Sequence, residues 1–198
     1  MLPRPAATLI LLREPDEVLM VQRNPALAFM GGFWVFPGGK VEDHDGSPEQ
    51  AARRELTEEV ALELGADAEL IPFARWITPV GLPRRFDTWF FLARASSLLG
   101  TGDPTVDDSE IVAARWVRAA DALTDGRPLA FPTRKNLERL AAHPDIDSLI
   151  AAARVTPIEP ILPEIVTDDG RPAIVVPGSG EAPAHQPEPV TRAPELAD

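Results

Sequence analysis

The sequence predicts an α/β fold in which helices cover a mixed β-sheet. Two observations carry this prediction. Runs rich in Val, Ile, Leu and aromatic residues, bounded by turn residues, are typical of strands, and they occur in two groups along the chain. Each group is followed by a stretch of helical character, which differs from the regular strand–helix alternation of a doubly wound parallel sheet. A mixed α/β sandwich accommodates this order better.

The first group of strands begins with a hairpin and ends in a glycine turn. Residues 7–14 and 16–23 are the predicted hairpin strands, and Pro15 lies in the turn between them. Residues 34–39, WVFPGG, read as a further strand that enters a pair of glycines. Glycine permits close backbone approach to a ligand, so this turn is a candidate part of a site.

A helix follows this turn and carries its own start signal. Ser47 suits the N-cap, Pro48 suits the first helical position, and Gln50 lies three residues after Ser47, as in a capping box. The predicted helix ends near Gly65. Its apolar residues recur every four positions, which predicts one buried face. These residues are Ala52, Leu56, Val60 and Leu64.

The second group contains three predicted strands, at 69–79, 84–95 and 110–119. Predicted helical segments follow at 119–123, from near Thr133, and at 145–155. We expect a domain over 1–155, a C-terminal hairpin extension over 156–178, and a disordered tail over 179–198. The hairpin turn is predicted at residues 168–170, Asp-Asp-Gly, and the tail is rich in Pro, Ala and Glu without periodicity.

Composition excludes several kinds of chemistry. The 198 residues are 44% hydrophobic and 25% charged, which is ordinary for a globular chain, and none is cysteine. Disulfides, thiolate metal sites and a cysteine nucleophile are therefore excluded, and a cytoplasmic location is the expectation. The net charge of −12 argues against nucleic acid and against anionic membranes as partners. The apolar run at 6–12 is too short for a spanning helix.

Three glutamates crowd one face of the predicted helix. Glu55, Glu58 and Glu59 are spaced so that their side chains are neighbours. Like charges this close destabilise a helix unless a cation lies among them, and Mg²⁺ and Mn²⁺ prefer such oxygen ligands. Arg54 lies four residues before Glu58 and is placed to hold a carboxylate. An alternative interpretation, a solvated charged face, is open from the spacing alone.

The glycine turn and the glutamate helix together resemble the signature of the Nudix hydrolase superfamily. Gly39 fits its first glycine, residues 54–59 (RELTEE) fit its centre, and Leu62 fits its last apolar position. The resemblance implies a Nudix-type α/β/α sandwich that hydrolyses a diphosphate linkage with Mg²⁺ or Mn²⁺. It also implies metal ligands, a proton acceptor and an orienting residue. The implied ligands are Glu55, Glu58, Glu59 and the Gly39 carbonyl; Glu58 or Glu59 deprotonates water, and Arg54 orients a glutamate.

The sequence departs from the superfamily pattern in three features. Fourteen residues separate Gly39 from Arg54, where the pattern has thirteen. The loop glutamate of the pattern is missing, with Asp45 or Gly46 near its place, and Ala61 stands where the pattern has a glycine. Segments around the signature also resemble the branch related to coenzyme A diphosphatases. That branch carries a further arginine after the position of Arg23, which this chain lacks.

Candidate substrate-binding residues lie outside the signature. They are Arg23, Arg84, Arg85 and Glu110. The arginines would pair with phosphate, and Glu110 would serve as a base or extra ligand. Each has a plain alternative as a surface residue at a strand end. Phe33, Trp34 and Trp89 would either stack on a base or belong to the core, and His44 would either assist proton transfer or face solvent.

The leading hypothesis is a metal-dependent hydrolase of a small nucleoside diphosphate derivative. Coenzyme A-like compounds, ADP-ribose, NADH and nucleotide sugars all contain the required linkage. The alternative is a Nudix-fold nucleotide-binding or regulatory module with impaired catalysis, which the missing loop glutamate motivates. Similarity to dimeric relatives makes a homodimer one assembly to test. A third possibility is a purely structural interaction protein that uses the proline-rich tail as a ligand segment. It is disfavoured because the tail has no clear PxxP core with flanking arginines.

Overall fold

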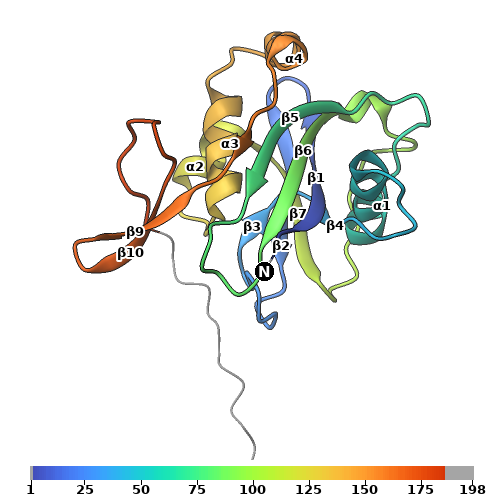
Figure 1. Ribbon diagram of the computed structural model, residues 1–198. Helices are drawn as coiled ribbons and strands as arrows, with labels where there is room; N and C mark the ends of the chain where they lie inside the picture. Colours follow the sequence, from blue (N-terminus) through green and yellow to red (C-terminus); the bar gives the residue numbers. More distant parts are fainter. Residues whose placement is uncertain (1, 186–198) are drawn as a thin grey trace, which may run out of the picture.

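The structure, a computed structural model, describes residues 2–185 and confirms the predicted sandwich of helices around a mixed sheet (Figure 1). The elements in chain order are β1 (Arg4–Arg13), β2 (Glu17–Arg23), β3 (Trp34–Val35), β4 (Gly38–Lys40), α1 (Pro48–Val60), β5 (Ile71–Ile77), β6 (Phe86–Arg94), a 3₁₀ turn (Ala95–Ser97), β7 (Ile111–Arg118), α2 (Ala119–Thr124), α3 (Phe131–Ala141), α4 (Ile146–Val155), β8 (Pro160–Ile161), β9 (Glu164–Asp168) and β10 (Arg171–Val175).

Strand β1 lies at the centre of the sheet. It runs parallel to β6 and antiparallel to β2 and β4, while β2 also pairs with β3 and β7. β5 continues the sheet antiparallel to β6, and β8 adds a parallel edge strand to β5. Because both faces of β1 are covered, its sequence is an almost unbroken apolar run.

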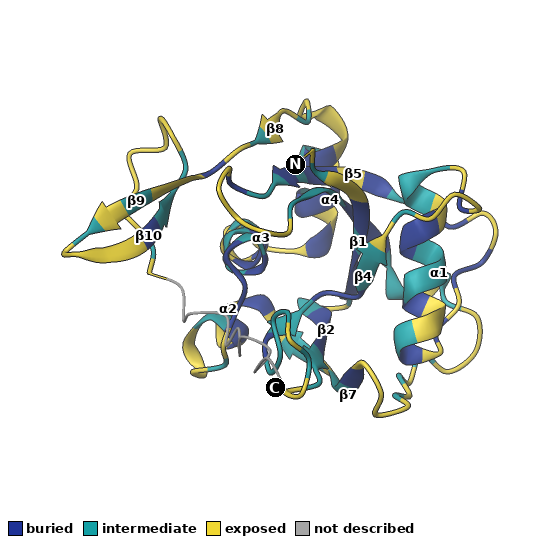
Figure 2. Cartoon of the chain, turned by 60° about the horizontal axis from the view of Figure 1, so that its bottom comes forward, coloured by how far each residue is buried: buried dark blue, intermediate teal, exposed yellow. Residues whose placement is uncertain are grey.

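The two faces of the sheet carry separate cores. Side chains alternate along β1, so Leu9 and Leu11 pack beneath α1, whereas Ile10 and Leu12 pack on the face covered by α2, α3 and α4. Figure 2 shows the buried strands between these helices and the largely exposed β9–β10 hairpin at one side. α1 is thereby fixed against the sheet with its polar face free for chemistry.

Helix α1 starts as predicted and ends earlier. Ser47 caps it by accepting a hydrogen bond from the Gln50 backbone N–H at 3.3 Å, and Pro48 is its first residue. The helix stops at Val60 instead of near Gly65, because Ala61 adopts the left-handed conformation (φ 55°, ψ 30°) that ends a helix. Leu64 is buried, but it lies beyond the helix and bridges to Leu98.

The later elements follow the predicted order, with small shifts at their ends. α3 begins at Phe131, slightly before the expected Thr133, because Pro132 is accommodated in the first turn. The C-terminal hairpin turns at Asp169 and Gly170, which both have positive φ, as a two-residue hairpin turn requires. Residues 179–185 return to it, where Ala184 bridges to Ile174. The rest of the predicted tail, 186–198, lies outside the described residues.

Among residues 2–185, no helix has the length and apolarity needed to cross a membrane.

Candidate metal and diphosphate site

Two carboxylates of α1 lie against the glycine turn. The backbone N–H of Gly38 donates a hydrogen bond to Glu59 Oε2 at 3.0 Å. The Glu55 carboxylate lies directly over Gly39, where an added Cβ would come within 2.3 Å of Oε1. Only glycine leaves this space, so the turn and the helix are matched to each other. Gly39, Glu55 and Glu59 are therefore brought together in the structure.

Burial and mutual repulsion raise the pKa values of these two acids. Burial is the main reason that the pKa of Glu55 lies above its ordinary value. Burial likewise raises the pKa of Glu59 to about 8, because the hydrogen bond from Gly38 and the charge of Arg23 offset it only in part. The nearby charges of Glu55 and Glu110 add to the rise at Glu59. A cation placed here would relieve this repulsion.

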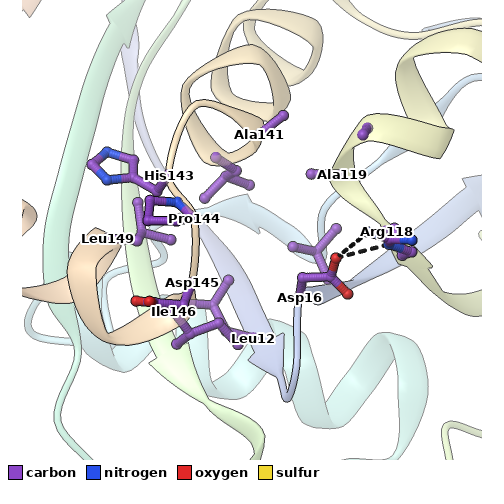
Figure 3. A pocket seen from close by; sticks show the side chains of 13 residues that line it. Leu12, Asp16, Arg118, Ala119, Ala141, His143, Pro144, Asp145, Ile146 and Leu149 are labelled. Atoms are coloured by element: carbon purple, nitrogen blue, oxygen red, sulfur yellow. Dashed lines mark hydrogen bonds and ion pairs between the residues drawn. The ribbon is translucent and has the colours of Figure 1, made fainter.

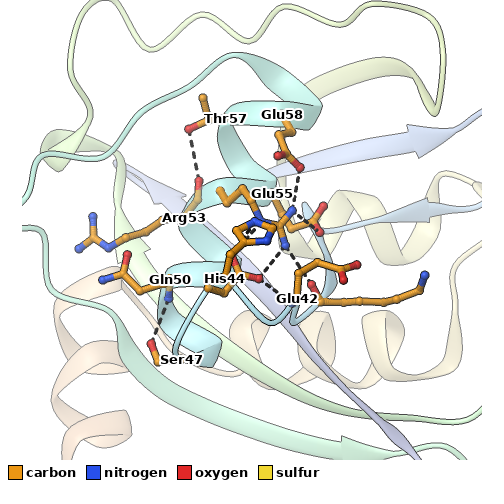
Figure 4. Close-up of polar contacts among 11 residues, drawn as sticks. Glu42, His44, Ser47, Gln50, Arg53, Glu55, Thr57 and Glu58 are labelled. Carbon is orange, nitrogen blue, oxygen red and sulfur yellow. Dashed lines mark hydrogen bonds and ion pairs between the residues drawn. The ribbon is translucent and has the colours of Figure 1, made fainter.

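Arg54 connects the loop to the glutamates. Figure 4 shows Glu55 and Glu58 on α1 and the loop residues Glu42 and His44. Its Nη1 donates to Glu55 Oε1 at 2.9 Å and to Glu58 Oε2 at 2.7 Å. Its Nη2 donates to the Lys40 carbonyl at 3.0 Å. Glu58 is more than half exposed and extends toward this guanidinium rather than toward the glycine turn. The environment of the exposed Glu58 thus differs from that of the partly buried Glu55 and Glu59, a difference that spacing on the helix did not reveal.

Asp45 is the residue that sequence reasoning undervalued. Its side chain is 3% exposed, and its carboxylate accepts from Arg54 Nε at 2.8 Å and Nη2 at 2.9 Å. These hydrogen bonds, with one from the Glu42 backbone, hold the pKa of Asp45 at about 2. A signal was present: Asp45 stands at the pattern's spacing from Gly39, so the extra loop residue follows it.

Arg23 and Glu110 lie at the border of this site. The charge of Arg23 lowers the pKa of Glu59, while the charge of Glu110 raises those of Glu55 and Glu59. The Glu110 carbonyl accepts from the Asn24 backbone N–H at 2.7 Å, which ties the start of β7 to the end of β2. Both candidates therefore share the electrostatic environment of the glutamate pair.

Arg84 and Arg85 lie in the β5–β6 loop, just before β6. Arg85 Nε donates to the Thr78 and Pro79 carbonyls at 3.0 and 3.1 Å, which secures the loop. The exposed Arg84 lies over the Phe29 ring, 5.9 Å from its centroid.

Phe33 is buried in the protein, and the other three candidates, Trp34, Trp89 and His44, lie against neighbouring side chains. Trp34 is covered by the Arg127 guanidinium at 4.7 Å, and Trp89 stacks with Phe91. His44 is 72% exposed, with Nε2 3.9 Å from Asp45 Oδ1.

The donor set suits a hard divalent cation. Carboxylate oxygens and a backbone carbonyl are the ligands that Mg²⁺ and Mn²⁺ prefer, and Gly39 leaves room beside Glu55. In the described part of the chain, no three His, Asp or Glu side chains already surround a single point. Glu55 and Glu59 face the glycine turn, whereas Glu58 contacts Arg54.

A surface hollow elsewhere is separate from this site. It has a volume of about 200 Å³ and lies where the β1–β2 turn meets the ends of α2, α3 and α4. Figure 3 shows Asp16 and Arg118 paired on one side and His143 on the other. Its floor is apolar, including Leu12 and Leu149, and none of the site glutamates lines it.

Comparison with known proteins identifies the family. The profile described as "NUDIX domain" matches residues 2–139, and the chain belongs to this family. A NUDIX hydrolase of known structure from Alicyclobacillus acidocaldarius superimposes with a TM-score of 0.65 and 27% identity, over 79% of this chain and 99% of that one. The predicted Nudix resemblance is confirmed, and these matches do not single out the coenzyme A diphosphatase branch.

Curated relatives match shorter stretches. The "8-oxo-dGTP diphosphatase" of Proteus vulgaris is 51% identical over 49 residues, which is 25% of this chain and 42% of that protein. The "RNA pyrophosphohydrolase" of Pseudomonas aeruginosa is 38% identical over 82 residues, which is 41% of this chain and 47% of that protein. The matches thus span less than half the length of these two relatives.

Proposed function

We propose that the protein is a metal-dependent diphosphatase that cleaves the diphosphate linkage of a nucleoside diphosphate derivative. The observation that carries the proposal is the pair of partly buried acids at the glycine turn, with Glu55 over Gly39 and Glu59 bonded to the Gly38 N–H. Burying two adjacent carboxylates is costly unless a cation binds between them. Membership of the NUDIX family and the names of the two curated relatives support the same reaction class.

Each residue has a distinct part in this proposal. Glu55, Glu58, Glu59 and the Gly39 carbonyl would hold Mg²⁺ or Mn²⁺. When bound, the metal neutralises phosphate charge and acidifies water. Glu59, whose carboxylate is fixed by the hydrogen bond from the Gly38 N–H, is the proposed acceptor of the proton of the water that attacks phosphorus. Arg54 is a positioning residue that fixes Glu55 and Glu58.

Arg23, at the border of the glutamate pair, would contact the substrate phosphates. Glu110 would orient the substrate or the attacking water from the start of β7. The substrate would be a small molecule rather than a nucleic acid, since the net charge of −12 disfavours a polyanion. Coenzyme A-like compounds, ADP-ribose, NADH and nucleotide sugars are the first candidates.

The alternative, a binding module without turnover, rested on the missing loop glutamate. Asp45 supplies a carboxylate that binds Arg54 from the loop, so this reason for the alternative is weakened.

The test is a product assay with Mg²⁺ or Mn²⁺ on these four substrate classes. Glu55→Gln and Glu59→Gln should each lower kcat by at least a hundredfold while Glu63→Gln, an exposed glutamate just past the helix, retains wild-type activity. Activity that survives both site substitutions would disprove the assigned site. Metal and nucleotide binding without any turnover would instead support the binding module.

A further inference from the structure

A group of arginines and phenylalanines lies at the end of the sheet where β1 and β6 begin. We call Arg4, Phe29, Arg84 and Phe86 the arginine–phenylalanine cluster. The Phe29 and Phe86 rings have centroids 5.9 Å apart, and Arg84 lies over Phe29 at the same distance. Arg4 is paired with Phe86 in the parallel register of β1 and β6, so the two side chains leave the sheet on one face.

The cluster is connected to the metal site through two backbone routes. Along β1, Thr8 pairs with Gly38, whose N–H holds Glu59, and Arg4 lies four residues away, at about 13 Å for an extended strand. Through the β2–β3 loop, Arg23 Nε donates to the Phe29 carbonyl at 3.4 Å. Figure 1 shows the β5–β6 connection close to the start of β1, where the Arg4 backbone N–H donates to the Arg85 carbonyl at 2.9 Å.

The two exposed arginines of the cluster, Arg4 and Arg84, carry positive charges that can bind an anion. Within residues 2–185, neither Arg4 nor Arg84 forms an ion pair with a carboxylate, whereas Arg75 and Arg94 are paired with Asp87 and Asp147. Such exposed guanidinium groups in a chain of net charge −12 mark a local preference for an anion. Contact with the aromatic ring of Phe29 also restricts the orientation of Arg84.

We propose that Arg4 and Arg84 bind a phosphate monoester that the substrate carries apart from its scissile diphosphate. The inference rests on the proposed function for the location of the diphosphate. The predicted substrate class is a nucleoside diphosphate derivative whose ribose bears an additional phosphate. Phe29, over which the Arg84 guanidinium lies, and Phe86 form the apolar base of the cluster.

Matched pairs of compounds test this directly: coenzyme A against dephospho-coenzyme A, and NADPH against NADH. The full-length protein should show at least a tenfold higher kcat/KM for the phosphorylated member in one of the pairs. The Arg4→Gln, Arg84→Gln double variant should lose this preference. Arg171→Gln, which removes an exposed arginine on the C-terminal hairpin, should keep it.

Equal kcat/KM values for both members of both pairs, or a preference that persists in the double variant, would overturn the proposal. Measurements of binding affinity distinguish failure of this proposal from failure of the proposed function. If no compound is hydrolysed, calorimetric Kd values for the same pairs should still differ by at least tenfold, and the double variant should again remove the difference. Equal affinities, or no binding of any of the four compounds, would then overturn it.

Discussion

Asp45 accepts two hydrogen bonds from Arg54, at 2.8 Å from Nε and 2.9 Å from Nη2, and so locks the loop before α1 onto the helix. The same guanidinium holds Glu55 and Glu58. Loop and glutamates are therefore positioned as one unit, with Asp45 as its anchor. A carboxylate from the loop is needed for this arrangement, and an aspartate supplies it where the Nudix pattern has a glutamate.

Asp45→Asn removes one charge from this unit and weakens both hydrogen bonds. Buried charged hydrogen bonds of this kind contribute about 1–3 kcal/mol, so the free energy of unfolding should fall by that amount. Because Arg54 is then less well held, kcat should fall about tenfold with little change in KM. Urea unfolding and steady-state kinetics measure the two effects. The control is Asp43→Asn, at an exposed loop position; equal losses in both variants would contradict the anchoring role.

Gly39→Ala should damage the site without unfolding the protein. The added Cβ meets the Glu55 carboxylate, so this side chain must leave its place over the turn. Mn²⁺ affinity, measured by calorimetry, should fall at least tenfold, while thermal unfolding stays cooperative. Gly126→Ala is the comparison, because its Cβ meets no atom within 4 Å and only its positive φ of 83° is strained. That variant should lose about 1 kcal/mol of stability and retain Mn²⁺ binding.

Much of the fold was predictable because local signals and burial agree. Ser47 and Pro48 start α1, and Asp169 and Gly170 turn the last hairpin, each through backbone chemistry that a short stretch of sequence encodes. The end of α1 was predicted wrongly near Gly65. The periodic apolar pattern continues to Leu64, but Ala61 changes the direction of the chain, and Leu64 is buried by other contacts.

The site was only partly predictable for a similar reason. Gly39, Glu55 and Glu59 meet because a strand–turn–helix motif fixes them locally. The spacing of Glu58 and Glu59 made the two residues appear equivalent, yet Glu59 is largely buried and Glu58 is exposed beside Arg54. That difference depends on how α1 rests on β1 and β4, which no local pattern encodes.

Ala61→Gly should stabilise the protein by about 1 kcal/mol. An alanine in the left-handed region is strained, and glycine adopts this conformation freely. Ala61 is exposed, so no packing is lost. Ala142→Gly is the opposite case, because Ala142 ends α3 in the right-handed region (φ −77°) and glycine there only adds flexibility to the unfolded chain. Urea denaturation should therefore give changes of opposite sign; a loss of stability in Ala61→Gly would contradict the strain.

The metal-free protein should become less stable as the pH rises from about 5 to 8. The folded state raises the pKa of Glu59 to about 8 from an ordinary value of 4.5, so between these values the folded protein keeps a proton that the unfolded chain has released. The stability that this proton confers is fully present below 4.5 and is lost as the pH approaches 8, on the order of a few kcal/mol. Glu55, whose pKa is also raised, acts in the same direction.

Glu59→Gln should flatten this pH dependence, because an amide does not titrate, and the smaller slope that remains should come from Glu55. Asp45 does not contribute to the pH dependence between 5 and 8. Its pKa is lowered to about 2, so its ionised carboxylate stabilises the fold above pH 4, and this contribution is lost only between pH 4 and 2. Mg²⁺ should raise the melting temperature more at pH 8 than at pH 5, where the proton competes with the cation. Differential scanning fluorimetry across this range, with and without Mg²⁺, makes the measurement. Parallel curves for wild type and Glu59→Gln would show that Glu59 ionises normally in the folded protein.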